Sequence, residues 1–496
     1  MAPHAANCGP RYSEVVVNEF LHLVLIRPAL FVSVFLCISL AQPGYGLPDF
    51  SSLRKQAGVT AVTWVAVEGD ELVSIGGDGY YSLQEKRKAD ADSLIRVGSI
   101  TKVFTALAAV KLAEAGQLKL DEPIGGILPD KPVHSAWRQS PVTVEMLIEH
   151  TAGLTDLSRA EFNYPRALTL EQALVVNPEG RRSRWRPGWH QSYSNAAAGL
   201  VSATIEAATD QDYDQWFAEQ ILAWLDMPDS SLVWSEKVQE QLVRGYDQDL
   251  MTEIPYWHTL FRAFGGLNTT AKDMRQLLLL LVNQGRLNGK RLLKALTIER
   301  MQTPTLSLKA QAGVHNGYGL GLKREQYRGH TVYAHNGDAD GYLARIAYSA
   351  DSKRGYFVVI NAFRHDLLET FVNPLDTWLI ESLPEKSVTS GFSLSRESIL
   401  AMQGEYQEVG RRFGFVSESG SSSRLRRLSL VEENGVLLRQ FAGQERRIKL
   451  LPVAQGLFRH RNESKASVAW VQASDGHAYL QGEFGNFKKI DASGKR

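Results

Sequence analysis

Two residues near position 100 have types and spacing that favour nucleophilic catalysis. Ser99 and Lys102 lie three residues apart at the start of a predicted helix, so their side chains would share one face. A serine hydroxyl is a weak nucleophile until a base takes its proton. A buried lysine can be that base, because burial disfavours its charged form. Taken alone, the pair also fits a helix-capping serine beside a solvated lysine.

Serine–lysine chemistry further needs a proton carrier, a group that holds the substrate and an oxyanion hole. Tyr193-Ser194-Asn195 offers candidates for the first two, between Pro187-Gly188 and a predicted helix. By itself, this segment fits a surface tyrosine followed by a helix cap. His335-Asn336-Gly337 follows a strand-like segment and, by itself, fits a hairpin turn.

The surrounding patterns predict the elements that position these residues. A helix is expected from Ser99 to about Ala115, ended by Gly116. Thr270 and Asp273 predict a capping box for a later helix. Strands at both ends of this region and helices between them predict one sheet closed by distant segments, with a helical insertion. The expected strands are residues 59–67, 71–75, 331–334, 342–349 and 356–361, and the other expected helices are 143–149, 170–176, 195–208, 213–225 and 270–282.

The C-terminal part has a different pattern. After a polar stretch at residues 384–393, short strand-like segments recur at regular spacing to residue 485. They predict a small all-β module, either a sandwich or a barrel. The length of 496 residues agrees with two or three domains.

Composition limits the classes of partner. The formal net charge is +1, and no run of Lys or Arg is interleaved with aromatic residues, so a nucleic-acid partner is not expected. The 12 histidines include no His-Glu-x-x-His motif, and neither a metal site nor a cofactor is expected. The partner that remains is a small-molecule or peptide substrate, and the sequence does not fix the oligomeric state.

The N-terminal segment predicts export. The 13 uncharged residues from Ala29 to Ala41 are mostly apolar, too few to span a bilayer, and typical of a signal-peptide core. Residues 1–41 are interpreted as a signal peptide of a periplasmic or secreted protein. Membrane anchoring through residues 20–41 is the alternative. Cys8 and Cys37 both lie in this segment, so the exported chain would contain no disulfide.

Five segments, read in order, resemble the motifs of the serine β-lactamase and penicillin-binding-protein superfamily, and in particular its class C β-lactamase-like hydrolases. The resemblance covers residues 50–385 and implies an α+β, β-lactamase-like fold, with an antiparallel sheet flanked by helices and a helical subdomain. Residues 395–496 resemble the lipocalin-like β-barrel appended to many members. The segments are Ile-Arg-Val-Gly-Ser-Ile-Thr-Lys at 95–102, His-Thr-Ala-Gly-Leu at 150–154, Pro-Gly followed by Tyr-Ser-Asn at 187–195, Gly-Gly-Leu at 265–267 and His-Asn-Gly at 335–337.

The resemblance implies a role for each motif residue. Ser99 would be the acylated nucleophile, Lys102 would take its proton, and Tyr193 would shuttle protons to the leaving group and from the deacylating water. A nearby ammonium is expected to lower the pKa of Tyr193. Asn195 would hold the amide or ester flank of the substrate. The backbone N–H groups of Ser99 and Asp338 would form the oxyanion hole. The substrate-binding strand would comprise His335, Asn336, Gly337 and Asp338.

Two departures from the family pattern bear on the substrate. His335 stands where many relatives have a lysine that can bind a carboxylate, and a neutral histidine lacks that fixed charge. Hydrolysis of an ester or amide, of the β-lactamase, esterase or D-amino-acid peptidase type, is therefore expected, and efficient β-lactamase or DD-carboxypeptidase activity is less strongly indicated than ester or amide hydrolysis in general. Asp338 replaces a small residue and would favour a substrate with an amine nearby. The alternative function is a catalytically silent penicillin-binding-like sensor or binding protein.

Overall fold

The computed structural model describes residues 46–128, 134–157, 159–386, 391–412 and 425–490. Residues 45–496 form one compact unit. The segment interpreted as a signal peptide or anchor, with Cys8 and Cys37, lies outside the described residues. Among the described helices, none combines the length and the apolar character that crossing a bilayer requires.

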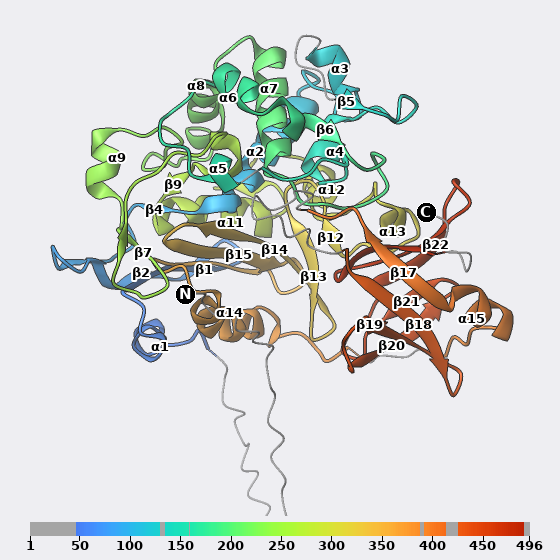
Figure 1. The fold of residues 1–496 in the computed structure, drawn as a ribbon. Coiled ribbons are helices and arrows are strands. Elements are labelled where there is room, and N and C mark those ends of the chain that lie inside the picture. Colours follow the sequence, from blue (N-terminus) through green and yellow to red (C-terminus); the bar gives the residue numbers. More distant parts are fainter. Residues whose placement is uncertain (1–45, 129–133, 158, 387–390, 413–424, 491–496) are drawn as a thin grey trace, which may run out of the picture. The chain divides into compact units, whose positions relative to one another are not determined.

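An eight-stranded antiparallel sheet forms the centre of the larger part of the molecule (Figure 1). Its inner strand β1 pairs with β16 from far along the chain and with β2 beside it, as the sequence pattern predicts. The strands, in spatial order, are β12 (Gly317–Tyr318), β13 (Lys323–Tyr327), β14 (His330–Ala339), β15 (Tyr342–Ser349), β16 (Arg354–Ile360), β1 (Ala61–Glu68), β2 (Glu71–Ser82) and β3 (Arg87–Lys88).

The sheet is buried on both faces, because alternate side chains of its central strands enter two separate cores. In β15, Ala344 and Ile346 pack with the helix α11 (Ala271–Val282), whereas Leu343 and Ala347 pack with α14 (His365–Ile380). Figure 1 shows these two helices on opposite sides of the sheet. The helix α1 (Phe50–Ala57) joins the α14 side, where Phe50 stacks on Trp64 with ring centroids 4.2 Å apart.

Helices inserted between β3 and β12 build a layer above the α11 face. They include α2 and α7, which pack against each other and against α10. The predicted capping box of α11 forms only in part: Thr270 accepts the N–H of Asp273, but the Asp273 carboxylate accepts hydrogen bonds from Asp229 and Ser230 instead. These helices are α2 (Thr101–Glu114), α3 (Ile124–Ile127), α4 (Val144–Ile148), α5 (Arg159–Phe162), α6 (Leu170–Val176), α7 (Asn195–Thr209), α8 (Tyr213–Phe217), α9 (Glu236–Gln241), α10 (Arg262–Gly265), α12 (Ala295–Gln302) and α13 (Leu308–Gln311).

The C-terminal all-β module is a closed antiparallel barrel with its own apolar core, preceded by α15 (Arg396–Met402). It contacts the edge of the large sheet, where Gln326 of β13 accepts a hydrogen bond from the backbone of Ser464 at 3.2 Å. The structure thus confirms the predicted α+β fold with an all-β module. The barrel strands are β17 (Gly404–Val409), β18 (Arg427–Glu433), β19 (Val436–Phe441), β20 (Arg447–Ala454), β21 (Leu457–Arg459), β22 (Val468–Gln472), β23 (Ala478–Gly482) and β24 (Gly485–Lys489).

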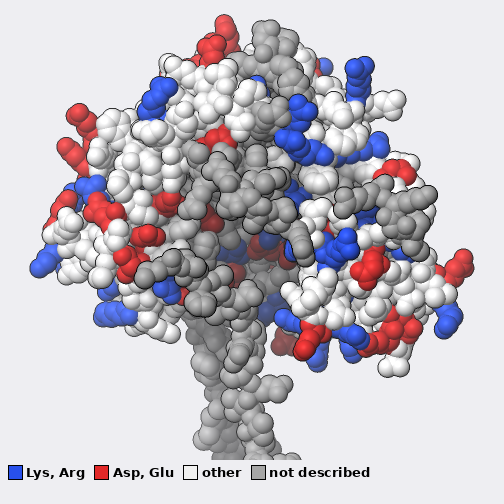
Figure 2. Space-filling model, in the orientation of Figure 1, with Lys and Arg blue, Asp and Glu red and all other residues white. Residues whose placement is uncertain are grey.

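Charged side chains of both signs are interspersed over the described part of the face shown in Figure 2. This agrees with the near-zero formal net charge of the chain. The described part of that face therefore presents neither a basic nor an acidic field.

Candidate active site

Ser99 is positioned by a short strand, a left-handed glycine and the start of α2. The strand β4 (Ile95–Arg96) pairs with β9 (Asn268–Thr269), and Ser99 follows in η1 (Gly98–Ile100), a turn of 3-10 helix. Gly98 has a φ of +52°, and a Cβ on it would lie 2.6 Å from the carbonyl oxygen of Asp338. Only glycine fits this contact. The backbone of β14 therefore passes directly beside the nucleophile candidate.

Lys102 lies one turn below Ser99, as the spacing predicts. Its Nζ is 3.1 Å from Ser99 Oγ and donates a hydrogen bond to the carbonyl oxygen of Phe264 at 2.7 Å. The side chain is only 4% exposed, and burial lowers the pKa of Lys102 well below its ordinary value. A neutral amine at this distance can accept the Ser99 proton, whereas an ammonium could not.

Tyr193 completes the cluster. Its phenol is close enough to Ser99 for the serine hydroxyl to act on the phenol pKa. Lys102 Nζ lies 4.9 Å from the ring centroid, and the buried His150 ring packs against the Tyr193 ring with centroids 4.2 Å apart. Burial, and then the neighbouring Tyr318, raise the pKa of Tyr193 well above its ordinary value. The expected lowering was wrong, because burial of the phenol is the largest influence on its pKa and favours the protonated form. Tyr193 is therefore a proton donor at neutral pH.

Asn195 is held by a buried carboxylate that sequence reasoning did not single out. Its backbone N–H and its Nδ2 donate to the two oxygens of Asp156 at 2.7 and 3.1 Å. Its Oδ1 has no hydrogen-bond partner among the described residues although it is buried at the cleft. An orphaned acceptor in such a place can take a hydrogen bond from the N–H of a bound amide. Asp156 stands two residues beyond the segment 150–154, which was the available signal.

The segment 335–337 lies within β14 and not in a turn after it, so the hairpin interpretation was wrong. His335 Nδ1 is 2.6 Å from the carbonyl oxygen of Asn336, and burial, with the nearby Lys102, lowers the pKa of His335 to about 3. His335 is therefore neutral, as expected. Gly337 packs on the backbone of Val97.

Asn336 and Asp338, on the same strand, have different surroundings. Asn336 Oδ1 accepts a hydrogen bond from Arg345 at 2.9 Å. The Asp338 side chain is 54% exposed, and its Oδ2 lies 3.2 Å from Nε2 of His365. The Asp338 carboxylate is therefore open to the cleft.

Arg412 enters the site from the C-terminal barrel, and no sequence signal pointed to it. It follows β17, its Nε donates to Asp156 Oδ2 at 2.7 Å, and its backbone carbonyl accepts the N–H of Asp156 at 3.0 Å. The guanidinium carbon lies 4.5 Å from the centroid of the Tyr193 ring. Two modules of the fold thus contribute to one cleft.

Most of these residues line a cleft of about 630 Å³, whereas Lys102 and Asp156 are not part of its lining. Aromatic rings form part of its wall. Two carboxylates, of Asp338 and Asp340, and one guanidinium, of Arg412, also line it. Among the described residues, no group of three His, Cys, Asp or Glu side chains gathers as metal ligands do. The lining residues are Ser99, Phe162, Asn163, Tyr193, Asn195, Trp257, Phe264, Gly265, Tyr318, His335, Asn336, Asp338, Ala339, Asp340, Phe363 and Arg412.

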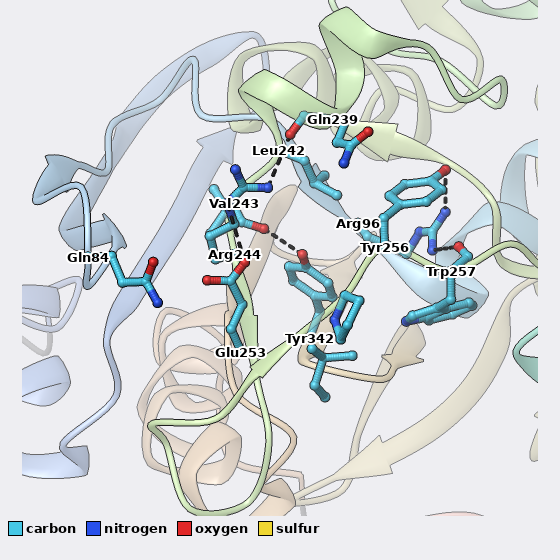
Figure 3. A pocket seen from close by; sticks show the side chains of 12 residues that line it. Gln84, Arg96, Gln239, Leu242, Val243, Arg244, Glu253, Tyr256, Trp257 and Tyr342 are labelled. Carbon is cyan, nitrogen blue, oxygen red and sulfur yellow. Dashed lines mark hydrogen bonds and ion pairs between the residues drawn. The ribbon is translucent and has the colours of Figure 1, made fainter.

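A second hollow, of about 420 Å³, has a different chemistry (Figure 3). Arg96 lies between the rings of Tyr256 and Trp257, 4.6 and 4.4 Å from their centroids, and donates to the Trp257 carbonyl at 2.7 Å. Arg244 and Glu253 form a loose ion pair at 3.6 Å on another side. Its described lining contains no serine, cysteine or histidine, so the nucleophile chemistry belongs to the cleft around Ser99.

Comparisons with known proteins agree with this geometry. A profile of the Beta-lactamase family matches residues 49–373. The chain is 28% identical over 193 residues to the D-alanyl-D-alanine-carboxypeptidase/endopeptidase AmpH of Escherichia coli strain K12, covering 35% of this chain and 46% of AmpH. It is 24% identical over 313 residues to penicillin-binding protein 4 of Amycolatopsis lactamdurans, covering 60% of this chain and 79% of that protein.

The alignment with AmpH thus spans less than half of the length of that relative. Among solved structures, the octameric penicillin-binding protein homologue from Pyrococcus abyssi has a TM-score of 0.57 at 22% identity. That alignment covers 88% of this chain and 98% of the homologue, so the likeness in fold extends beyond the family match.

Proposed function

Because this chain belongs to the β-lactamase family, we propose that it is a serine hydrolase that cleaves an ester or amide through an acyl-enzyme. One observation carries the proposal: Ser99 Oγ lies 3.1 Å from the buried amine of Lys102, and Ser99 and Tyr193 line the same cleft. Nucleophile, base and proton donor are thereby neighbours at one site.

The reaction follows from these positions. Ser99 Oγ attacks the substrate carbonyl carbon while its proton passes to Lys102 Nζ, and the tetrahedral oxyanion faces the backbone N–H groups of Ser99 and Asp338. The bond to the leaving group then breaks, and the leaving atom takes a proton from Tyr193. Water next attacks the acyl-enzyme carbonyl and gives a proton to the Tyr193 oxygen. The bond to Ser99 then breaks, the Ser99 oxygen takes back the proton held by Lys102, and the acid is released, so that all three groups return to their starting states.

The cleft favours a substrate with an apolar part and a polar amide or ester flank. Phe162, Trp257 and Phe264 provide aromatic contact area, and the unpartnered Oδ1 of Asn195 is placed to accept an amide N–H. Relatives named as carboxypeptidases and penicillin-binding proteins support D-amino-acid amides and short peptides as substrates to test. The exposed Asp338 carboxylate would favour a substrate carrying an amine.

Labelling with a fluorescent phosphonate tests the nucleophile. Stoichiometric labelling of the wild-type protein, lost in Ser99→Ala, is the expected result. Labelling that persists in Ser99→Ala would contradict the assignment. A panel of short acyl esters, D-amino-acid amides and nitrocefin then identifies the preferred acyl group.

The second candidate function is a binding or sensor protein that is acylated but does not turn over. Burst kinetics with p-nitrophenyl esters separate it from the hydrolase. A burst of one equivalent followed by a steady rate is expected of the enzyme, and a burst without a steady rate is expected of the sensor.

Export is proposed on the sequence of residues 1–41 alone. The full chain, fused to a reporter that is active only outside the cytoplasm, should give reporter activity if residues 1–41 direct export. The same fusion without residues 1–41 should then give none.

A further inference from the structure

The C-terminal barrel contributes a cation to the cleft through a fixed set of contacts. Arg412 is tied to the hydrolase part by two hydrogen bonds with Asp156, one from its Nε at 2.7 Å and one to its backbone carbonyl at 3.0 Å. Its guanidinium covers the Tyr193 ring, with Cζ 4.5 Å from the centroid. A side chain bound on one side and stacked on the other is held in one orientation.

Asp156 links this arginine to the substrate-holding amide. The Asp156 side chain is fully buried, and it accepts hydrogen bonds from the backbone N–H and the Nδ2 of Asn195. A buried carboxylate requires a compensating charge, and Arg412 provides one. With Nδ2 occupied by Asp156, the Oδ1 of Asn195 is left as the acceptor at the cleft.

Arg412 and Asp156 also have opposite effects on the pKa of Lys102. The positive charge of Arg412 lowers the pKa of Lys102, whereas the negative charges of Asp156 and Asp338 raise it. Arg412 is 42% exposed, so water in the cleft screens part of its effect. The groups that face the Lys102 amine are Ser99, His150, Asp156, Tyr193, Phe264, His335, Asp338 and Arg412.

We propose that Arg412 is a positioning residue of the active site, supplied by the C-terminal barrel, which holds Asp156 against Asn195 and places a positive charge beside Tyr193 and Lys102. The barrel is then part of the catalytic centre and not a separate appendage. This inference rests on the proposed serine-hydrolase function, since it concerns the base and the substrate amide of that reaction.

The pH profile of the acylation rate tests the proposal. Its acid limb, where the rate rises with pH, reports the deprotonation of Lys102. Arg412→Gln removes a repulsive charge, so the limb moves to higher pH and acylation at pH 6 falls about three- to tenfold, with recovery at alkaline pH. Asp156→Asn removes an attractive charge and moves the limb to lower pH. Arg412→Lys keeps the charge and leaves the limb in place.

Arg426→Gln is the matched control, because Arg426 is a barrel arginine of similar exposure whose Nε donates to the buried Glu408 at 2.9 Å, away from the cleft. It should leave the acid limb unchanged. The measured rate is that of Ser99 phosphonylation by the fluorescent phosphonate at constant ionic strength, which replaces acylation in this test because both reactions require Lys102 to take the serine proton. Equal effects of Arg412→Gln and Arg426→Gln, or shifts of the same sign for Arg412→Gln and Asp156→Asn, would overturn the proposal. A wild-type protein that is not labelled at any pH would instead contradict the proposed function.

Discussion

The carbonyl oxygen of Phe264 accepts a hydrogen bond from Nζ of Lys102 at 2.7 Å. The same nitrogen lies 3.1 Å from Ser99 Oγ. The two contacts together fix the buried amine beside the serine hydroxyl.

Lys102→Ala should remove the base while leaving the nucleophile in place. We expect kcat/KM for a p-nitrophenyl ester to fall by about 10²- to 10⁴-fold, which is the usual contribution of a general base. Lys111→Ala is the control, because this lysine lies on the same helix but bonds to Gln220 at the surface. Near-normal activity in Lys102→Ala would exclude the proposed base.

Tyr193→Phe should slow the steps that need a proton donor. The leaving group then departs unassisted, so we expect kcat to fall by about 10²-fold or more for amides and less for p-nitrophenyl esters, whose leaving group is a weak base. Steady-state rates on a matched amide and ester measure the difference. An equal loss on both substrates would contradict a role in leaving-group protonation.

The pH profile of kcat/KM should rise from acid pH as Lys102 loses its proton, because burial lowers the pKa of this group and the neutral amine is the active form. It should then stay level into alkaline pH, because the pKa of Tyr193 is raised and the phenol keeps its proton. No transition is expected from His335, which is neutral above about pH 3. His335→Gln with an unchanged profile between pH 5 and 8 checks that assignment.

Asn195→Ala should discriminate amides from esters. The unpartnered Oδ1 can accept a hydrogen bond only from a substrate N–H, which esters lack. Loss of one such bond is worth about 1–3 kcal/mol, so kcat/KM for an amide should fall about 5- to 150-fold further than for the matching ester. If kcat/KM falls equally for the amide and the ester, Asn195 has only a structural role.

Gly98→Ala should destabilise the protein through its backbone. The new Cβ would meet the carbonyl of Asp338 at 2.6 Å, at a φ of +52° that favours glycine. We expect the free energy of unfolding to fall by about 1–3 kcal/mol in denaturant titrations. Gly116→Ala, with a φ of +73° and open space around it, should cost no more than about 1 kcal/mol.

The residue types and their order were sufficient to predict the cluster around Ser99, because helical spacing sets the distance to Lys102. The direction of the Tyr193 pKa was not predictable, because it depends on how deeply two groups far apart in sequence are buried together. The Asp156–Arg412 pair was beyond sequence reasoning for a similar reason. Its members are 256 residues apart, and the docking of the barrel decides whether they meet.

The same limits apply to the fold. The strand β15 has the bounds that were predicted for it, residues 342–349, because its mostly apolar segment is long enough to be recognised. The strands β17, β21 and β24 were missed. Each has only three to six residues, which is too short for a clear period. The strands that pair with it in the closed barrel therefore determine its conformation.

The place of β1 inside the large sheet has a consequence for how the chain is made. Glu68 at the end of β1 is paired with Arg354 of β16, 286 residues later. At about 5–20 residues per second, a ribosome needs roughly 15–60 seconds to synthesise that interval. During this delay the apolar hairpin of β1 and β2 lacks one neighbour, so newly made chains should depend on a chaperone until the partner strand emerges.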